Sequence, residues 1–238
     1  MRSRRLLTIA AAAALALECY SPVWAQAPTS TTNQFDEADR AQSAASVLKE
    51  IMDAPDKGIP NSLLKKAVGV AVIPHVVKGA FGVGGRYGKG LVAQRNADGW
   101  GTPLFIEIGG GSFGFQLGVE ATDVVMVFTN SEGIKPLLKG KLKIGADASA
   151  TAGPVGRKAE AGTDILLKSA IYSYSRSKGL FAGIALDGAV LQLDDGANKN
   201  VYGKESKAAD LSTRKVGAAA VAVVQPFLDA LQKYAPKQ

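Results

Sequence analysis

The chain has 238 residues, a formal net charge of +7, one cysteine and one histidine. A single cysteine excludes a disulfide framework, and with only one histidine beside it a zinc site built from nitrogen and sulfur ligands is not expected. Glycine accounts for 27 of the 238 residues, a larger share than the roughly 7 % of an average protein. This enrichment indicates many turns and glycine-bearing strands.

The N-terminal segment is typical of a secretory signal peptide. Arginines at its start precede an apolar run from Leu6 to Leu17, and Ala25 is a small residue that a signal peptidase accepts. The run is shorter than a membrane span, which favours export over anchoring. Cys19 follows a glutamate instead of a small residue, which argues against a lipoprotein. We therefore expect cleavage after Ala25 and a periplasmic or secreted protein with no thiolate chemistry.

The mature chain is expected to form one domain over residues 34–238 after a disordered polar leader over 26–33. From Phe35 to Met52, apolar residues recur at spacings of three and four, which predicts an amphipathic helix. Residues 60–67 predict a short helix, and residues 68–74 predict a buried strand.

Alternation of bulky and bare side chains marks three glycine-rich segments, over 79–90, 104–120 and 179–188. The middle segment has the clearest pattern. Its bulky side chains before and after the glycines are Leu104, Ile106 and Ile108, then Phe113, Phe115, Leu117 and Val119. With Gly109–Gly111 as the reversal between the two halves, this pattern predicts an antiparallel hairpin with one buried face.

The remaining elements are shorter. Residues 123–129 predict a central strand, 131–138 a helix capped by Ser131, and 141–147 a half-exposed strand. Residues 153–158 predict a loop, 165–177 an extended segment, 194–202 turns, and a final helix begins near Thr213. Strands do not alternate with long helices, so the predicted fold is α+β, a curved, mainly antiparallel sheet or incomplete barrel packed with N- and C-terminal helices.

Motifs that resemble enzyme sites do not have the structure that those sites need. Residues 110–114 match the nucleophile elbow G-x-S-x-G, and 109–114 match a dinucleotide fingerprint. Both require a helix after the motif, whereas the pattern here continues as a strand, and the only histidine, His75, comes earlier. The sequence thus predicts no enzyme, no cofactor and no metal. A calcium site would draw its oxygens from Asp187, Asp194, Asp195 and Asn198, but turn residues explain this cluster more simply.

Basic residues gather beside leucines late in the chain: Lys135, Lys139, Lys141 and Lys143, followed by Arg157 and Lys158 in a glycine loop. Such residues hold proteins on anionic membranes, although an ordinary solvated face is the simpler interpretation from composition alone. Aromatic residues are not interleaved with these positions, which argues against nucleic acid as a partner.

Several ordered blocks closely resemble the SYLF domain over residues 60–211. They are KKAVGVAVIP (65–74), GAFGVGGRYGKG (79–90), GGGSFGFQLG (109–118), GADASATAGPVGR (145–157) and YSYSRSKGLFAGIALDGA (172–189). The resemblance implies lipid binding, since eukaryotic members are described as binding phosphoinositides and membranes, and fungal members also bind actin. It implies that the contact is made by an N-terminal amphipathic segment and by basic residues, here Lys65, Lys66, Lys78, Arg86 and Lys89.

Together these patterns predict a non-enzymatic, exported module that binds anionic lipid or membrane surfaces. For an exported bacterial protein the expected partner is a phospholipid such as phosphatidylglycerol or cardiolipin, or else an envelope or host protein. Two alternatives stay open at this point: a carrier of an apolar ligand held between sheet and helices, and a structural module that contacts actin-like filaments.

Overall fold

A computed structural model describes residues 29–54, 58–81, 83–112, 118–155, 169–177, 180–203 and 216–236. Several predictions fall outside these residues. They include the signal peptide over 1–25, the buried face predicted for Phe113, Phe115, Leu117 and Val119, the basic pair Arg157 and Lys158, and the start of the final helix near Thr213.

The strands occupy most of the chain between the first and last helices. They are β1 (Gly69–Phe81), β2 (Val83–Asn96), β3 (Gly99–Trp100), β4 (Leu104–Ser112), β5 (Gly118–Phe128), β6 (Lys141–Lys143), β7 (Ala150–Ala152), β8 (Ile171–Ser177), β9 (Leu180–Gly183) and β10 (Val190–Leu193).

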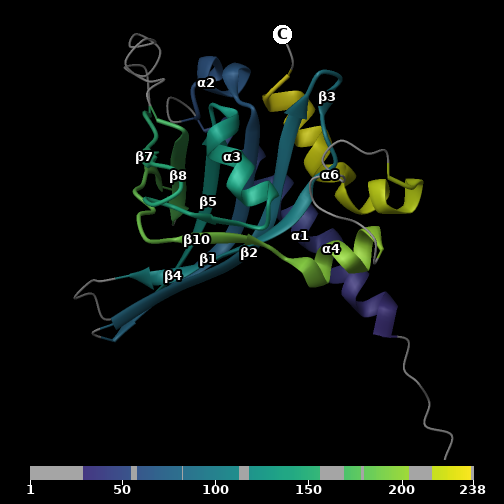
Figure 1. The fold of residues 1–238 in the computed structure, drawn as a ribbon, viewed down its shortest axis with the longest axis horizontal. Helices are drawn as coiled ribbons and strands as arrows, with labels where there is room; N and C mark the ends of the chain where they lie inside the picture. Colours follow the sequence, from purple (N-terminus) through teal and green to yellow (C-terminus); the bar gives the residue numbers. More distant parts are fainter. Residues whose placement is uncertain are drawn as a thin grey trace, which may run out of the picture.

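These strands form one curled sheet with the order β6-β10-β4-β2-β1-β5-β8-β7, in which β3 also pairs with β2 and β9 with β8. Among the described strands, only β7 and β8 pair in parallel. Figure 1 shows the sheet bending into half a barrel. The predicted α+β fold, with a curved and mainly antiparallel sheet, is therefore confirmed.

The helices are α1 (Thr29–Met52), α2 (Asn61–Lys66), α3 (Ser131–Leu138), α4 (Asp195–Tyr202) and α6 (Ala218–Tyr234). In Figure 1, α1 and α6 lie together on one side of the sheet, and α3 lies on the other. This confirms the helices predicted over 35–52 and 60–67. The first begins earlier than expected, at Thr29, inside the segment predicted to be a disordered leader.

The sheet carries a hydrophobic core on each face, because the side chains of its central strands alternate between two buried surroundings. Val70 and Val72 of β1 pack in the core that α1, α2, α4 and α6 cover, which we call the helix-facing core. Ala71 and Ile73 pack in the core on the inner face of the curl, together with α3, which we call the inner core. The prediction that residues 123–129 form a strand buried on both faces is likewise confirmed, since Val124 to Phe128 are buried.

The hairpin predicted over 104–120 is wrong. β4 continues straight through its glycines, where Gly109 pairs with Tyr87 and Gly111 with Gly85 of β2. The next described strand, β5, does not pair with β4, because β2 and β1 lie between them. A period-two pattern shows which side chains share a face but does not show which strand lies alongside.

The extended segment predicted over 79–90 is also corrected, because it spans the end of β1 and the start of β2. These strands form the antiparallel hairpin, with Phe81 paired to Val83 and Gly79 to Gly85. Both halves of this segment are rich in glycine, so the sequence pattern gave no sign of which residues reverse the chain.

A β-bulge at Pro74 and His75 interrupts β1 and exchanges its faces. Val72 lies in the helix-facing core, whereas Val76, an even number of residues later, lies in the inner core. The pairing of β1 with β5 shifts register between Ile73 and Val76. His75 has a positive φ of 51°, and its backbone N–H donates to Asp123 Oδ1 at 3.0 Å. The bulge thereby places Lys78 on the inner face of the sheet.

Three local predictions need correction. The segment predicted as turns over 194–202 instead contains the helix α4 (Asp195–Tyr202), which Asp194 caps by accepting a hydrogen bond from the N–H of Ala197. Asn130, not Ser131, caps α3. On β9 the bulky face is shifted by one residue: Leu180 is 68 % exposed, whereas Phe181 is only 8 % exposed.

Candidate functional site

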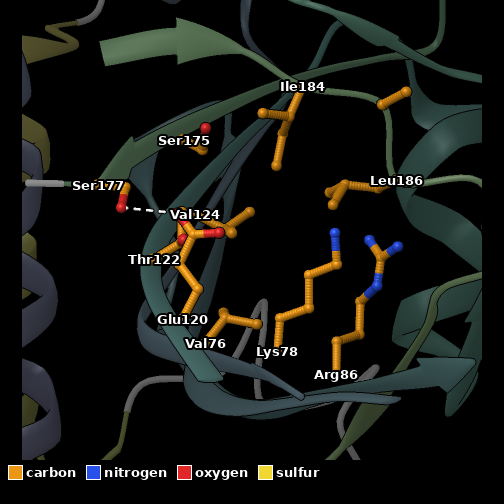
Figure 2. Close-up of a pocket in the computed structure, with 11 residues that line it drawn as sticks. Val76, Lys78, Arg86, Glu120, Thr122, Val124, Ser175, Ser177, Ile184 and Leu186 are labelled. Atoms are coloured by element: carbon orange, nitrogen blue, oxygen red, sulfur yellow. Dashed lines mark hydrogen bonds between the residues drawn. The ribbon is translucent and has the colours of Figure 1, made fainter. Parts of the chain in front are cut away.

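A cavity of about 220 Å³ opens on the inner face of the sheet. It lies where β1, β2, β5 and β8 meet the segment that follows β9 (Figure 2). Its lining residues are Val76, Lys78, Arg86, Glu120, Thr122, Val124, Ser175, Ser177, Ile184, Ala185 and Leu186. Several of these side chains are charged or polar, so the cavity is the strongest candidate for a binding site in the described part of the chain.

Two cations lie side by side in this cavity. Lys78 on β1 and Arg86 on β2 are directly opposite one another in the strand pairing. Their side chains extend in the same direction, toward Leu186 and Ile184 (Figure 2). Both were predicted as lipid-binding residues, and the structure brings them together.

The charge of Arg86 is partly desolvated and poorly neutralised. Its side chain is half-buried, and its Nε is buried without a hydrogen-bond partner among the described residues. Burial lowers the pKa of Arg86, and the nearby charge of Asp187 opposes this shift. Since an arginine stays protonated at neutral pH, the site holds a cation that an incoming anion would stabilise.

Lys78 adds a second, more accessible charge. Its side chain is exposed, and no ion pair joins it to another residue in the described part of the chain. The cation pair therefore combines a planar guanidinium, suited to bidentate binding of a phosphate or carboxylate, with a mobile ammonium group.

The other walls of the cavity are apolar on one side and polar on the other. Val76, Val124 and Leu186 are 5 %, 2 % and 2 % exposed, and they form apolar walls. On the polar side, Ser177 Oγ donates to Glu120 Oε1 at 2.8 Å. The cavity is thus suited to an anion that is attached to an apolar body.

The other predicted basic residues do not join this pair. Lys89 extends from the opposite face of the sheet and forms an ion pair with Asp194 at 3.0 Å. Asp194 also forms an ion pair with Arg40. This hydrogen bond with Asp194 raises the pKa of Lys89. Because Asp194 caps α4, Lys89 helps to hold that helix in place. Exposed positions are taken by Lys65, Lys66, Lys135, Lys139, Lys141 and Lys143. Of these, Lys135 pairs with Glu132 at 2.6 Å.

The residues considered for calcium have structural roles. Asp194 caps α4 and pairs with Arg40 and Lys89. The amide of Asn198 bonds to the backbone N–H and carbonyl of Phe105 at 2.9 and 2.8 Å, which ties α4 to β4. Within the described ranges, no group of three or more His, Cys, Asp or Glu residues is arranged to hold a metal ion.

Sequence reasoning missed the polar side of the cavity, formed by Glu120, Thr122, Ser175 and Ser177. Glu120 on β5 lies directly opposite Lys78 on β1 in the strand register. Ser177 comes from β8, more than fifty residues later in the chain. Only the strand order brings these residues together. Alternation along 118–124 was the sole signal available, since it places Glu120 and Thr122 on one face.

A family model described as Ysc84, Las17-binding protein actin regulator, matches residues 109–234. This range begins within β4 and continues to the end of α6. It therefore includes the polar side of the cavity and the apolar residues of the segment after β9.

Curated proteins from animals and yeast are similar over a longer range. SH3 domain-containing YSC84-like protein 1 of Bos taurus is 35 % identical over 178 residues, which is 72 % of this chain and 52 % of that protein. The protein of the same name from Xenopus laevis is 36 % identical over 172 residues, or 69 % of this chain and 51 % of the relative. Protein YSC84 of Saccharomyces cerevisiae is 36 % identical over 171 residues, or 68 % of this chain and 36 % of the relative. The chain thus spans about half of the animal relatives and less of the yeast protein.

Proposed function

The chain belongs to the Ysc84, or SYLF, family, and from this membership and the geometry of the cavity we propose that it is a non-enzymatic module that binds anionic lipids and membrane surfaces. The observation that carries the proposal is the pair formed by Lys78 and Arg86 beside apolar walls. A half-buried guanidinium whose Nε has no hydrogen-bond partner among the described residues costs free energy, so a negatively charged partner best explains its presence.

The exposed lysines near α3 and β6 support the same function from outside the cavity. Lys141 and Lys143 are exposed on either side of the buried Leu142, and Lys139 precedes them in an exposed turn. Each lysine near an anionic bilayer adds roughly 1 kcal/mol of attraction, which falls off within a Debye length. These residues would therefore draw the protein toward a membrane, where the cavity engages individual headgroups.

The dimensions of the cavity favour this function over carriage of a whole lipid. Pockets that enclose a small molecule typically measure about 300–1,000 Å³, whereas this cavity measures about 220 Å³. It is large enough for a headgroup or the end of a chain. Mass spectrometry of an organic extract of the purified protein tests the carrier alternative, which predicts a lipid in stoichiometric amount.

Vesicle co-sedimentation over a salt series tests the proposed function. We expect binding to phosphatidylcholine vesicles that contain phosphatidylglycerol, little binding to phosphatidylcholine alone, and weaker binding as salt increases. Lys78→Gln and Arg86→Gln should each weaken binding about fivefold, the effect of roughly 1 kcal/mol. Lys199→Gln is the matched control, because Lys199 is an exposed lysine on α4. Equal binding to both vesicles, or binding to neither, would overturn the proposal.

The names of the relatives suggest a second candidate, a protein partner related to actin or Las17. One observation favours it: Val77 and Tyr87 pair across β1 and β2 and are 45 % and 51 % exposed, beyond the cover of the helices. Exposed apolar side chains that adjoin one another often mark a protein interface. Co-sedimentation with actin filaments, compared between the wild type and Tyr87→Ser, tests this candidate. Export remains a prediction of the sequence, and reporter fusions to residues 1–28 test it.

A further inference from the structure

The charges of the cavity form a row of both signs. Arg86, Lys78 and Glu120 lie on the neighbouring strands β2, β1 and β5, and each is directly opposite the next. Adjacent strands are about 4.8 Å apart, so three charged side chains rise from one row on the same face. Figure 2 shows the two cations on one side of the cavity and the Glu120 carboxylate on the other, directed at Ser177.

Glu120 does not neutralise Lys78, although it is the cross-strand neighbour. Its Oε1 accepts the hydrogen bond from Ser177 Oγ at 2.8 Å, and no described residue donates to Oε2. Among the described residues no ion pair joins Glu120 to Lys78. The carboxylate and the cations are thus held apart, with the hydroxyl-bearing residues Thr122 and Ser175 also lining the space.

We propose that the cavity recognises a phosphate ester whose headgroup also carries a primary ammonium, with the phosphate at Lys78 and Arg86 and the ammonium at Glu120. This inference rests on the proposed function, and it specifies the headgroup that the cavity takes once the protein lies on an anionic surface. A phosphate accepts paired hydrogen bonds from a guanidinium, and an ammonium has three N–H donors for the carboxylate.

Charge balance separates this ligand from a simple anion. A headgroup with only negative charge would be attracted by Lys78 and Arg86 but repelled by Glu120 in the same row. A headgroup with phosphate and ammonium matches both ends of the row. A trimethylammonium carries the same charge but has no N–H to donate, so choline loses the hydrogen bond to Glu120 that ethanolamine makes. The glycerol and the first acyl carbons would contact the apolar walls formed by Val76, Val124 and Leu186.

The test compares two vesicles with the same content of phosphatidylglycerol, one made with phosphatidylethanolamine and one with phosphatidylcholine. Their net charge is equal, and they differ at the ammonium. We expect about tenfold tighter binding to the ethanolamine vesicle, the effect of one hydrogen bond between charged groups. Soluble glycerophosphoethanolamine should compete with the vesicles, whereas glycerophosphocholine and inorganic phosphate should compete less.

Glu120→Gln separates recognition of the ammonium from any effect of bilayer packing. The side chain is exposed, so the variant should fold, which circular dichroism checks. We expect it to lose the preference for ethanolamine while it still binds the phosphatidylcholine and phosphatidylglycerol vesicle. A preference that survives in Glu120→Gln, equal binding of the wild type to both vesicles, or equal competition by inorganic phosphate would overturn the inference and leave the proposed function standing. Failure of the wild-type protein to bind any of the vesicles would instead overturn the proposed function.

Discussion

The two ends of β1 and β2 have different surroundings although they belong to the same strands. At one end, Val70 and Leu91 lie fully buried beneath α1, α2 and α6. At the other, the hairpin extends past these helices (Figure 1), and Lys78, Tyr87 and a half-buried Arg86 line or surround open space. At the covered end, the guanidinium of Arg95 donates to three backbone carbonyls, whereas at the free end no ion pair or side-chain hydrogen bond engages Arg86 among the described residues. The same pair of strands thus stabilises the fold at one end and is available for binding at the other.

The largest expected effect of a substitution lies at the covered end. Phe227 of α6 is fully buried in the helix-facing core, and Phe227→Ala should lower the free energy of unfolding by about 3–5 kcal/mol. Leu180→Ala, at a residue that is 68 % exposed, should change it by less than about 0.5 kcal/mol. Urea unfolding followed by circular dichroism measures both. Similar losses in the two variants would contradict the proposed division of the molecule.

The ion pairs around Asp194 come next in size. Asp194→Asn should cost about 3 kcal/mol, because Arg40, whose side chain is only 12 % exposed, would lose its counter-ion. Lys89→Gln should cost less than about 1 kcal/mol, since the side chain of Lys89 is 42 % exposed. The same unfolding measurement applies. If the lysine variant loses as much stability as the aspartate variant, the pairing with Arg40 is not the dominant contact.

Two carboxyls in this region should give opposite pH dependences. Burial acts to raise the pKa of Asp194, but hydrogen bonds from the Ala197 N–H, Lys89 and Arg40 outweigh it, so the pKa lies below its ordinary 3.8. A depressed pKa stabilises the fold above the unfolded value, and that contribution is lost as the pH falls through the folded value. Burial raises the pKa of Glu37 above its ordinary 4.5. Its contribution is therefore present below pH 4.5 and is lost as the pH rises through the folded value.

Unfolding measured across this pH range separates the two groups. Glu37→Gln should remove the loss that occurs as the pH rises, and it should gain about 1 kcal/mol at neutral pH because Glu37 Oε2 is buried without a partner among the described residues. Asp194→Asn should instead flatten the loss below pH 3.8. A neutral-pH loss of stability in Glu37→Gln would show that its charged form is favoured in the fold.

A pair of arginines compares the free and covered ends directly. Arg86 has a buried Nε with no described partner, so Arg86→Met should stabilise the protein by about 0.5–1 kcal/mol while it weakens vesicle binding. The Nε of Arg95 is likewise buried without a described partner, but its terminal nitrogens donate to the carbonyls of Leu64, Lys65 and Ala235, where the chain leaves α2 and α6. Arg95→Met should therefore cost about 2 kcal/mol. Thermal melts and vesicle binding of both variants check the contrast, and destabilisation by Arg86→Met would mean that its charge is satisfied within the fold.

The sequence predicted which side chains share one face of a strand, but it predicted less well which strands pair with one another. Alternation of Leu104, Ile106 and Ile108 correctly predicts a buried strand face, because side-chain period is a local property. The partners of that strand depend on pairing over long distances, and the hairpin predicted over 104–120 was therefore wrong.

The candidate site was predictable to the same extent. Lys78 and Arg86 were identified from motif blocks, but the polar side of the cavity depends on the strand order β2-β1-β5-β8 and could not be inferred. The side of the sheet that Lys78 occupies was also not predictable, since alternation from Val70 would place Lys78 with the helix-facing residues. One extra residue in the bulge reverses that placement.

The smallest expected effect on stability is that of a glycine at His75, in this bulge. His75 adopts a φ of 51°, where a glycine is tolerated and a β-branched residue is strained. His75→Gly should stay within about 0.5 kcal/mol of the wild type, whereas His75→Val should cost about 2 kcal/mol. Because the bulge directs Lys78 into the cavity, His75→Gly should also bind vesicles as the wild type does, and His75→Val should bind less tightly even at temperatures where it remains folded. Wild-type stability and binding in His75→Val would show that the face of β1 beyond Pro74 is fixed by its pairing with β2 and β5, and not by the backbone conformation of His75.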